Sequence, residues 1–323
     1  MNFTSLLLTF FLSPLLFSAS THATFAPPTT EWTWAGFEIV GLKKITKEQV
    51  IKQVPLKSGD IYKEEPLIWK TWCETLKSSF SFSDTHCSAV RYVEGQAYFV
   101  IDIIEAGDEH RNQFREAPAQ DIALTSEEVL KLYDLLYARL WKLFEQGITV
   151  KETADRGFLD FSDLEMHGIV MQLIEQVPQY RDNILDVLAN DKDAQKREKA
   201  ANLLNWTLNV LSETQVKASV LLDDPSSEVR NNISRFTLHF IDKVTVQTHR
   251  FGMIDNLLKQ LDRPSHGDRN KAIYNLLIIA TKFPEDRAYI KEHGLVLIDY
   301  IARESILSNV GALAVELQKL LQP

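Results

Sequence analysis

The chain has 323 residues, 45% of them hydrophobic, and carries a formal net charge of −9 at pH 7. This length allows two domains, each with a sizeable core. Because binding to nucleic-acid phosphates requires concentrated Lys and Arg, we do not expect so acidic a chain to bind nucleic acid.

The N-terminal segment has the features of an export signal. It contains no Asp, Glu, Lys or Arg before Glu31, and its apolar run from Leu6 to Phe17 is too short to span a bilayer. Small residues follow, which predicts a signal peptide over residues 1–26 that is cleaved near Ala23 or, alternatively, near Ala26. Because the segment lacks basic residues, an uncleaved anchor or a buried N-terminal helix is the other interpretation.

The rest of the chain has no apolar run as long as a membrane span, so we expect no transmembrane segment after cleavage. The chain has two cysteines, Cys73 and Cys87, and export would place them where disulfides persist. We therefore expect a disulfide between them, with two buried free cysteines as the alternative. Two cysteines without paired histidines are not expected to bind zinc.

The first part of the mature chain alternates extended and helical patterns. Gly36–Gly41 is typical of a strand, and Thr46 precedes a short helix. A second helix is predicted from Pro66 to Lys77. The β-rich runs 88–93 and 97–104 are separated by a short Gly-containing turn, which predicts a hairpin.

This order of strand, two helices and hairpin resembles the POTRA domain over residues 34–105. The resemblance is carried by Ile39-Val40-Gly41-Leu42, by Leu56-Lys57-Ser58-Gly59-Asp60-Ile61-Tyr62 and by the closing Ile103-Ile104-Glu105. The sequence departs from the family at Ser78–Phe82, where a Gly before an aromatic residue is usual. A cystatin-like or other small α+β domain is the alternative.

The POTRA resemblance implies a three-stranded sheet with two helices and an association with envelope assembly. It also implies an exposed strand at the edge of the sheet, to which a protein partner could add a strand. That edge would include Val90, Arg91 and Tyr92. Unpaired backbone groups would supply the affinity, and Arg91 with its neighbours would supply the selectivity.

Residues 106–124 contain few large apolar groups and are predicted to form a linker. Beyond them, Thr125-Ser126-Glu127-Glu128 is a capping-box pattern that opens a helix with a broad apolar face. Apolar residues then recur at helical spacing almost to the C-terminus. We therefore expect an all-α domain over residues 125–323, in which stacked helix pairs bury one another's apolar faces.

Three turn signatures recur between apolar helices in this region. They run from Asp191 to Arg197, from Asp224 to Arg230 and from Asp262 to Arg269. They resemble the turns of HEAT and armadillo repeats, which carry Asp-Pro and then Val-Arg, and the segment with Asp224, Pro225 and Arg230 is the closest copy. The resemblance implies a solenoid of HEAT-like helix pairs in which Arg230, and by extension Arg197 and Arg269, has a structural role.

Residues that could perform catalysis are sparse. The sequence lacks the nucleophile-elbow, dinucleotide, phosphate-loop and zinc-protease motifs, so we expect neither an enzyme nor a cofactor. The densest polar group is Asp160, Asp163 and His167, from which a metal or acid–base site could be written. The simpler interpretation is that Ser162 or Asp163 caps the helix that begins at Leu164.

Together these patterns predict an exported, non-enzymatic protein-binding scaffold, located in the periplasm or secreted. As an accessory factor in the bacterial cell envelope, it would use the edge of its sheet and the surface of its helical array. The alternatives are a secreted hydrolase with a site near Asp160, Asp163 and His167, or an effector directed at a host protein. Location separates the effector from the scaffold, because the two would share a fold.

Overall fold

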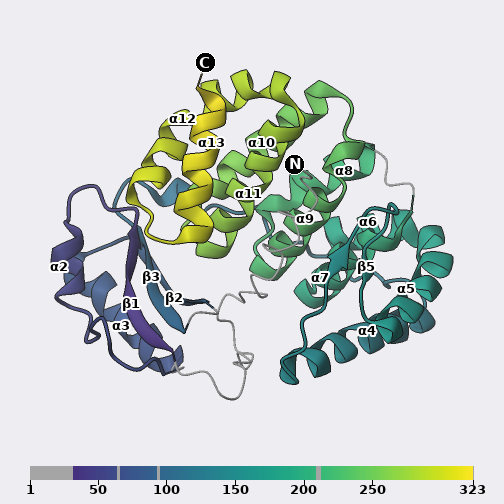
Figure 1. Cartoon of the computed structure of the whole chain (residues 1–323), viewed down its shortest axis with the longest axis horizontal. Coiled ribbons are helices and arrows are strands. Elements are labelled where there is room, and N and C mark those ends of the chain that lie inside the picture. The colour runs from purple at the N-terminus through teal and green to yellow at the C-terminus, as the bar shows by residue number, and fades with distance from the viewer. Residues whose placement is uncertain (1–31, 64–65, 93–94, 209–211, 323) are drawn as a thin grey trace. The chain divides into compact units, whose positions relative to one another are not determined.

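A computed structural model describes residues 32–63, 66–92, 95–208 and 212–322 (Figure 1). The predicted signal peptide, residues 1–26, lies outside the described residues. Within the described parts, none of the helices combines the length and the apolar composition that are needed to cross a bilayer.

The first described region is a three-stranded sheet with two helices, as predicted. Its elements in chain order are β1 (Thr33–Val40), α2 (Lys47–Ile51), α3 (Pro66–Phe80), β2 (Asp84–Tyr92) and β3 (Gln96–Ile104). The strands lie in the order β1-β3-β2, with β3 parallel to β1 and antiparallel to β2. The sheet is therefore mixed, and β2 is one of its edges.

One face of the sheet packs against α2 and α3 through an aromatic core. Trp34 contacts the rings of Tyr62, Trp69 and Phe99, and all but Tyr62 are almost fully buried. The short helix expected after Thr46 is α2, and it begins with a capping box: the Thr46 side chain accepts from the N–H of Gln49, and the Gln49 side chain accepts from the N–H of Thr46.

Gly41 ends β1 in a backbone conformation that favours glycine. Its φ is +96°, and a Cβ added there would lie 2.0 Å from the carbonyl oxygen of Ile103. A larger residue would therefore push β1 away from β3.

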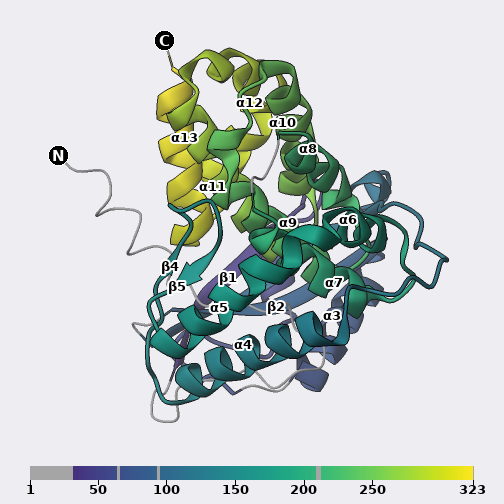
Figure 2. The ribbon, with the colours of Figure 1, turned by 90° about the vertical axis from the view of Figure 1, so that its right-hand side faces the viewer.

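The rest of the chain is mostly helical. The helices and short strands after the sheet are η1 (Glu109–Asn112), α4 (Glu127–Glu145), β4 (Glu152–Thr153), β5 (Asp160–Phe161), α5 (Leu164–Gln176), η2 (Val177–Tyr180), α6 (Arg181–Asn190), α7 (Ala194–Leu203), η3 (Leu204–Trp206), α8 (Ser212–Val220), η4 (Leu221–Asp223), α9 (Ser227–His239), η5 (Ile241–Lys243), α10 (Gln247–Asp262), α11 (His266–Lys282), η6 (Pro284–Asp286), α12 (Arg287–Glu304), the π-helix η7 (Ser308–Ala312) and α13 (Leu313–Leu321). Neighbouring helices such as α4 and α5 lie side by side (Figure 2).

The described chain divides into two compact units. The helical unit comprises residues 115–253, and the sheet unit comprises residues 32–114 together with residues 254–323. The domain boundaries predicted from the sequence differ from this division. They separate residues 34–105 from all the helices after residue 124 and place a linker at 106–124. Contacts between the sheet and residues far along the chain account for the difference.

Those contacts cover the second face of the sheet. Because side chains alternate along a strand, Glu38 of β1 and Asp102 of β3 point away from the aromatic core. The carboxylate of Glu38 accepts from the backbone N–H of Ile306 at 2.9 Å, and Arg269 of α11 donates to Asp102. Since Asp102 and Arg269 are both nearly inaccessible to solvent, the sheet and these C-terminal helices share one buried interface.

Removing one partner of this ion pair should destabilise the sheet unit. In Asp102→Ala the guanidinium of Arg269 stays buried without its carboxylate, so we expect the free energy of unfolding to fall by about 3–5 kcal/mol. The measurement is urea denaturation followed by circular dichroism.

The double variant Asp102→Leu with Arg269→Met is the control. It replaces both charges by apolar side chains, so most of the lost stability should return. A single variant that unfolds like the wild type would contradict a structural role for the pair.

Candidate functional site

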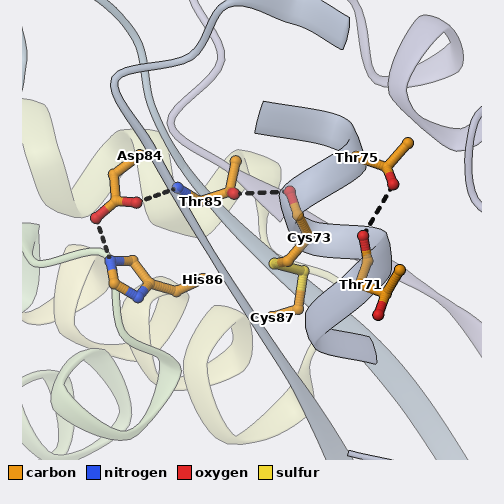
Figure 3. The surroundings of a disulfide bond; sticks show 7 residues. All are labelled: Thr71, Cys73, Thr75, Asp84, Thr85, His86 and Cys87. Carbon is orange, nitrogen blue, oxygen red and sulfur yellow. Dashed lines mark hydrogen bonds and ion pairs between the residues drawn. A yellow bond between two sulfur atoms is a disulfide. The ribbon is translucent and has the colours of Figure 1, made fainter. Parts of the chain in front are cut away.

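The two cysteines form a disulfide, as predicted (Figure 3). Cys73 of α3 and Cys87 of β2 have their Cα atoms 5.9 Å apart, and no other cysteine is present in the sequence. Nearby, the hydroxyl of Thr85 donates to the carbonyl oxygen of Cys73 at 3.0 Å, and Lys77 pairs with Asp84. The disulfide and the two polar contacts therefore fasten the edge strand to the helix beneath it.

The predicted binding edge, Val90, Arg91 and Tyr92, lies at the end of β2. Val90 is buried, and the hydroxyl of Tyr92 donates to the Asn309 side chain at 2.8 Å. The two side chains belong to the face that the C-terminal helices cover. Burial raises the pKa of the Tyr92 hydroxyl, so it remains a neutral donor.

Arg91 points to the opposite face of the sheet. Its guanidinium lies over the rings of Trp32 and Tyr62, at 5.2 and 5.8 Å from their centroids. Among the described residues, the backbone of β2 pairs with β3 and with no second strand. The outer backbone edge of β2 is consequently the part of this strand that remains for a partner.

Four arginines share one geometry: the three of the predicted turns and Arg250. In each of them the Nη1 atom donates to the carbonyl oxygen six residues earlier, and in three of the four it also donates to the carbonyl oxygen five residues earlier. Arg197 donates to the carbonyls of Asp191 and Lys192, and Arg230 donates to those of Asp224 and Pro225. Arg250 donates to the carbonyls of Val244 and Thr245, and Arg269 donates to that of Arg263. The guanidinium thus closes the turn before the helix on which it stands.

Asp224 connects two of these turns within the helical unit. Its oxygens accept from Nε and Nη2 of Arg197, both at 2.9 Å, from Arg115 at 2.5 Å and from the N–H of Ser226. Burial alone would raise the pKa of this carboxyl, but the hydrogen bonds from Arg197, Arg115 and Ser226 outweigh it and lower the pKa. Asp224 is therefore an ionised structural centre.

Asp160 and Asp163, the carboxylates of the possible hydrolase site, bind different partners. Asp160 accepts from His167 Nδ1 at 2.9 Å and also pairs with Arg156. Asp163 instead caps α5 by accepting from Met166 N at 3.0 Å. This confirms the capping interpretation.

The side chain of Asp163 also pairs with Arg139 of α4 at 2.8 Å. Of the Asp160, Asp163 and His167 side chains, those of Asp160 and His167 contact each other, whereas Asp163 meets His167 through a backbone hydrogen bond. In the residues that the structure describes, no three His, Cys, Asp or Glu side chains gather closely enough to hold a metal ion.

Three residues with central contacts were missed by the sequence analysis: Asp102, Arg115 and Arg250. Asp102 lies in a strand whose neighbours are apolar, which was a signal for a buried, paired carboxylate. Arg115 lies in the predicted linker, where a charged residue is unremarkable. Arg250 follows a turn that begins at Val244 and not at an Asp, so the sequence pattern did not include it.

Comparison with protein-family models, with curated proteins and with solved structures finds no match for this chain.

The lowered pKa of Asp224 gives a pH dependence with a definite sign. The folded carboxyl titrates below its ordinary value of 3.8, so its stabilising contribution is complete above that pH and is lost as pH falls through the folded pKa. In Asp224→Asn the unfolding free energy should therefore fall less steeply below pH 3.8 than in the wild type. Urea denaturation across that range measures both slopes.

A matched control is Asp242→Asn, which alters an exposed carboxyl paired with Lys243. This variant removes one exposed charge whose pairing with Lys243 contributes little to stability, so it controls for the loss of a carboxylate as such. If the unfolding free energy of wild type and of Asp224→Asn fell equally with pH, the stabilising role of the ionised Asp224 would be refuted.

Removing the disulfide should loosen the edge strand. The double variant Cys73→Ser with Cys87→Ser should lose about 3 kcal/mol of unfolding free energy, the value expected for a loop of this length. Hydrogen exchange should accelerate in β2 more than in α6. Wild-type protein reduced with dithiothreitol should behave like the variant, and equal stability of all three samples would contradict the prediction.

Proposed function

We propose that this protein is an exported, non-enzymatic protein-binding scaffold and an accessory factor of the bacterial cell envelope, either periplasmic or secreted. The observation that carries the proposal is the outer edge of β2, which pairs with no second strand among the described residues. An extended segment of a partner can hydrogen-bond to such an edge and extend the sheet.

The environment of β2 favours strand addition. The disulfide from Cys87 to Cys73 holds the strand in place before a partner arrives, which reduces the entropy lost on binding. The faces of the sheet are covered by α2 and α3 on one side and contacted by residues such as Arg269 and Asn309 on the other. Recognition would therefore use the backbone edge, with Arg91 and its aromatic neighbours beside it.

Two likenesses support the scaffold proposal. The mixed sheet has the element order on which the POTRA resemblance rests. The recurring arginine geometry of Arg197, Arg230, Arg250 and Arg269 is compatible with HEAT-like helix pairs. A disulfide also fits a compartment outside the cytoplasm, where such bonds persist.

The hydrolase alternative has less support. Asp160 and Asp163 bind different arginines, and Asp163 is occupied as a helix cap. Asp160 pairs with His167 and with Arg156, and neither contact provides a nucleophile that the imidazole could activate. No specific observation favours a second function.

The test is capture of envelope proteins by immobilised residues 27–323, compared between point variants. A truncation to residues 125–323 is less informative, because it leaves Arg269 buried without Asp102. A partner bound through β2 should be lost with Arg91→Glu and kept in part with Arg91→Lys, since the lysine keeps a positive charge over the aromatic rings beside the edge.

Hydrogen exchange then locates the contact. Addition of the captured protein should slow exchange of amides in β2, which gain hydrogen bonds, and should leave α6 unchanged. Capture that is insensitive to Arg91→Glu, with no protection in β2, would remove the basis of the proposal.

A further inference from the structure

The segment between the sheet and α4 is bound along its length in the helical unit. Residues 115–125, here called the strap, run beside the turn between α6 and α7, where Gln120 forms an isolated bridge with Asp191. At one end, Arg115 donates to the carbonyl oxygens of Ala189 and Leu188, at 2.6 and 3.1 Å, and to Asp224. The predicted linker is therefore a docked segment.

Most contacts of the strap involve its backbone. Gln120 forms a parallel bridge with Asp191, in which its N–H donates to the carbonyl of Asn190 and its carbonyl accepts from Lys192 N at 2.7 Å. Two residues later, the N–H of Ile122 donates to the Asp191 carboxylate at 2.7 Å.

The side chain of Asn183 binds two backbone groups near the end of the strap, one before Leu124 and one after it. The amide nitrogen of Asn183 donates to the carbonyl of Ala123 at 2.8 Å, and its oxygen accepts from the N–H of Thr125 at 2.9 Å. This donor–acceptor pair matches the spacing of an extended backbone and requires no particular side chain at either position. The surface therefore recognises an extended chain by its main-chain groups.

A single side chain in the middle of the strap adds charge recognition. Asp121 pairs with Lys196 at 2.6 Å and with Lys192 at 3.1 Å, and these contacts lower the pKa of its carboxyl. Lys196 also donates to the carbonyl of Ile122 at 3.1 Å. The two lysines consequently favour an acidic residue at this position.

Little hydrophobic burial holds the middle of the strap. From Glu116 to Ala123 no side chain is buried, and the first buried one is Leu124. Segments with few buried apolar contacts and solvent-exposed backbone hydrogen bonds open at low cost in free energy. Thr125 has a φ of +53°, an unfavourable conformation for a β-branched residue, which opening would relieve.

We propose that Asn183, Asp191, Lys192 and Lys196 form a docking surface for an extended, acidic segment of a partner protein, with the strap as its resident occupant. A partner segment with a carboxylate at the position of Asp121 and free backbone groups on either side would reproduce the contacts of residues 120–123. The surface lies in the helical unit and β2 lies in the sheet unit, so the two proposals rest on different residues. Failure of either proposal leaves the other standing.

The test displaces the strap and offers the same segment in trans. Gln120→Pro removes the N–H that donates to Asn190, whereas Gln120→Ala keeps it. A fluorescently labelled peptide of residues 117–125 is titrated into each full-length protein, and binding is followed by anisotropy. We expect Gln120→Pro to bind the peptide about ten-fold more tightly than wild type or Gln120→Ala, because the loss of one hydrogen bond favours opening by that factor.

Two further samples identify the surface. Asn183→Ala in the Gln120→Pro background should abolish the gain, and a peptide with Asn in place of Asp121 should bind several-fold more weakly. Equal affinity in all proteins, or binding that survives Asn183→Ala, would overturn the proposal. Unfolding of Gln120→Pro, seen by circular dichroism, would also overturn it, because the strap would then be an essential part of the helical unit.

Discussion

Buried arginines organise both compact units of this protein. A guanidinium has five N–H donors and stays charged, so burying it requires several acceptors in fixed positions. Arg197 meets this need with two turn carbonyls and the carboxylate of Asp224. Arg269 likewise donates to a turn carbonyl, that of Arg263, but the carboxylate that it binds belongs to Asp102 in the sheet. One local device therefore links helix to helix in one unit and helix to sheet in the other.

Local elements were predictable because their signals lie within a few residues of one another. Thr46 and Asp163 cap helices where the sequence places caps, and the hairpin of β2 and β3 follows its glycine turn. The disulfide was also predictable, since Cys73 and Cys87 had no competing partner. The caps and the hairpin depend on local backbone geometry, and the disulfide depends on the number of cysteines; both can be read from the sequence.

The long-range arrangement was not predictable in the same way. Pairing of Asp102 with Arg269, and of Tyr92 with Asn309, depends on which surfaces meet, and a single sequence does not specify that. The partners of Asp160 and Asp163 were unpredictable for a related reason: the two residues are close in sequence, but each pairs with a different arginine. The strap resembled a linker because its polar, small residues are bound through their backbone, which composition does not reveal.

The C-terminal helices that cover the second face of the sheet also affect the order in which the chain folds. Asp102 and Arg269 are 167 residues apart in the sequence, and Glu38 and Ile306 are 268 apart. A chain that emerges from its N-terminus completes β1, β3 and β2 long before the helices that cover them exist. Until those helices arrive, two buried carboxylates of the finished protein remain in water, and the sheet presents a face that other chains can contact. Such high contact order slows folding and prolongs that exposed stage.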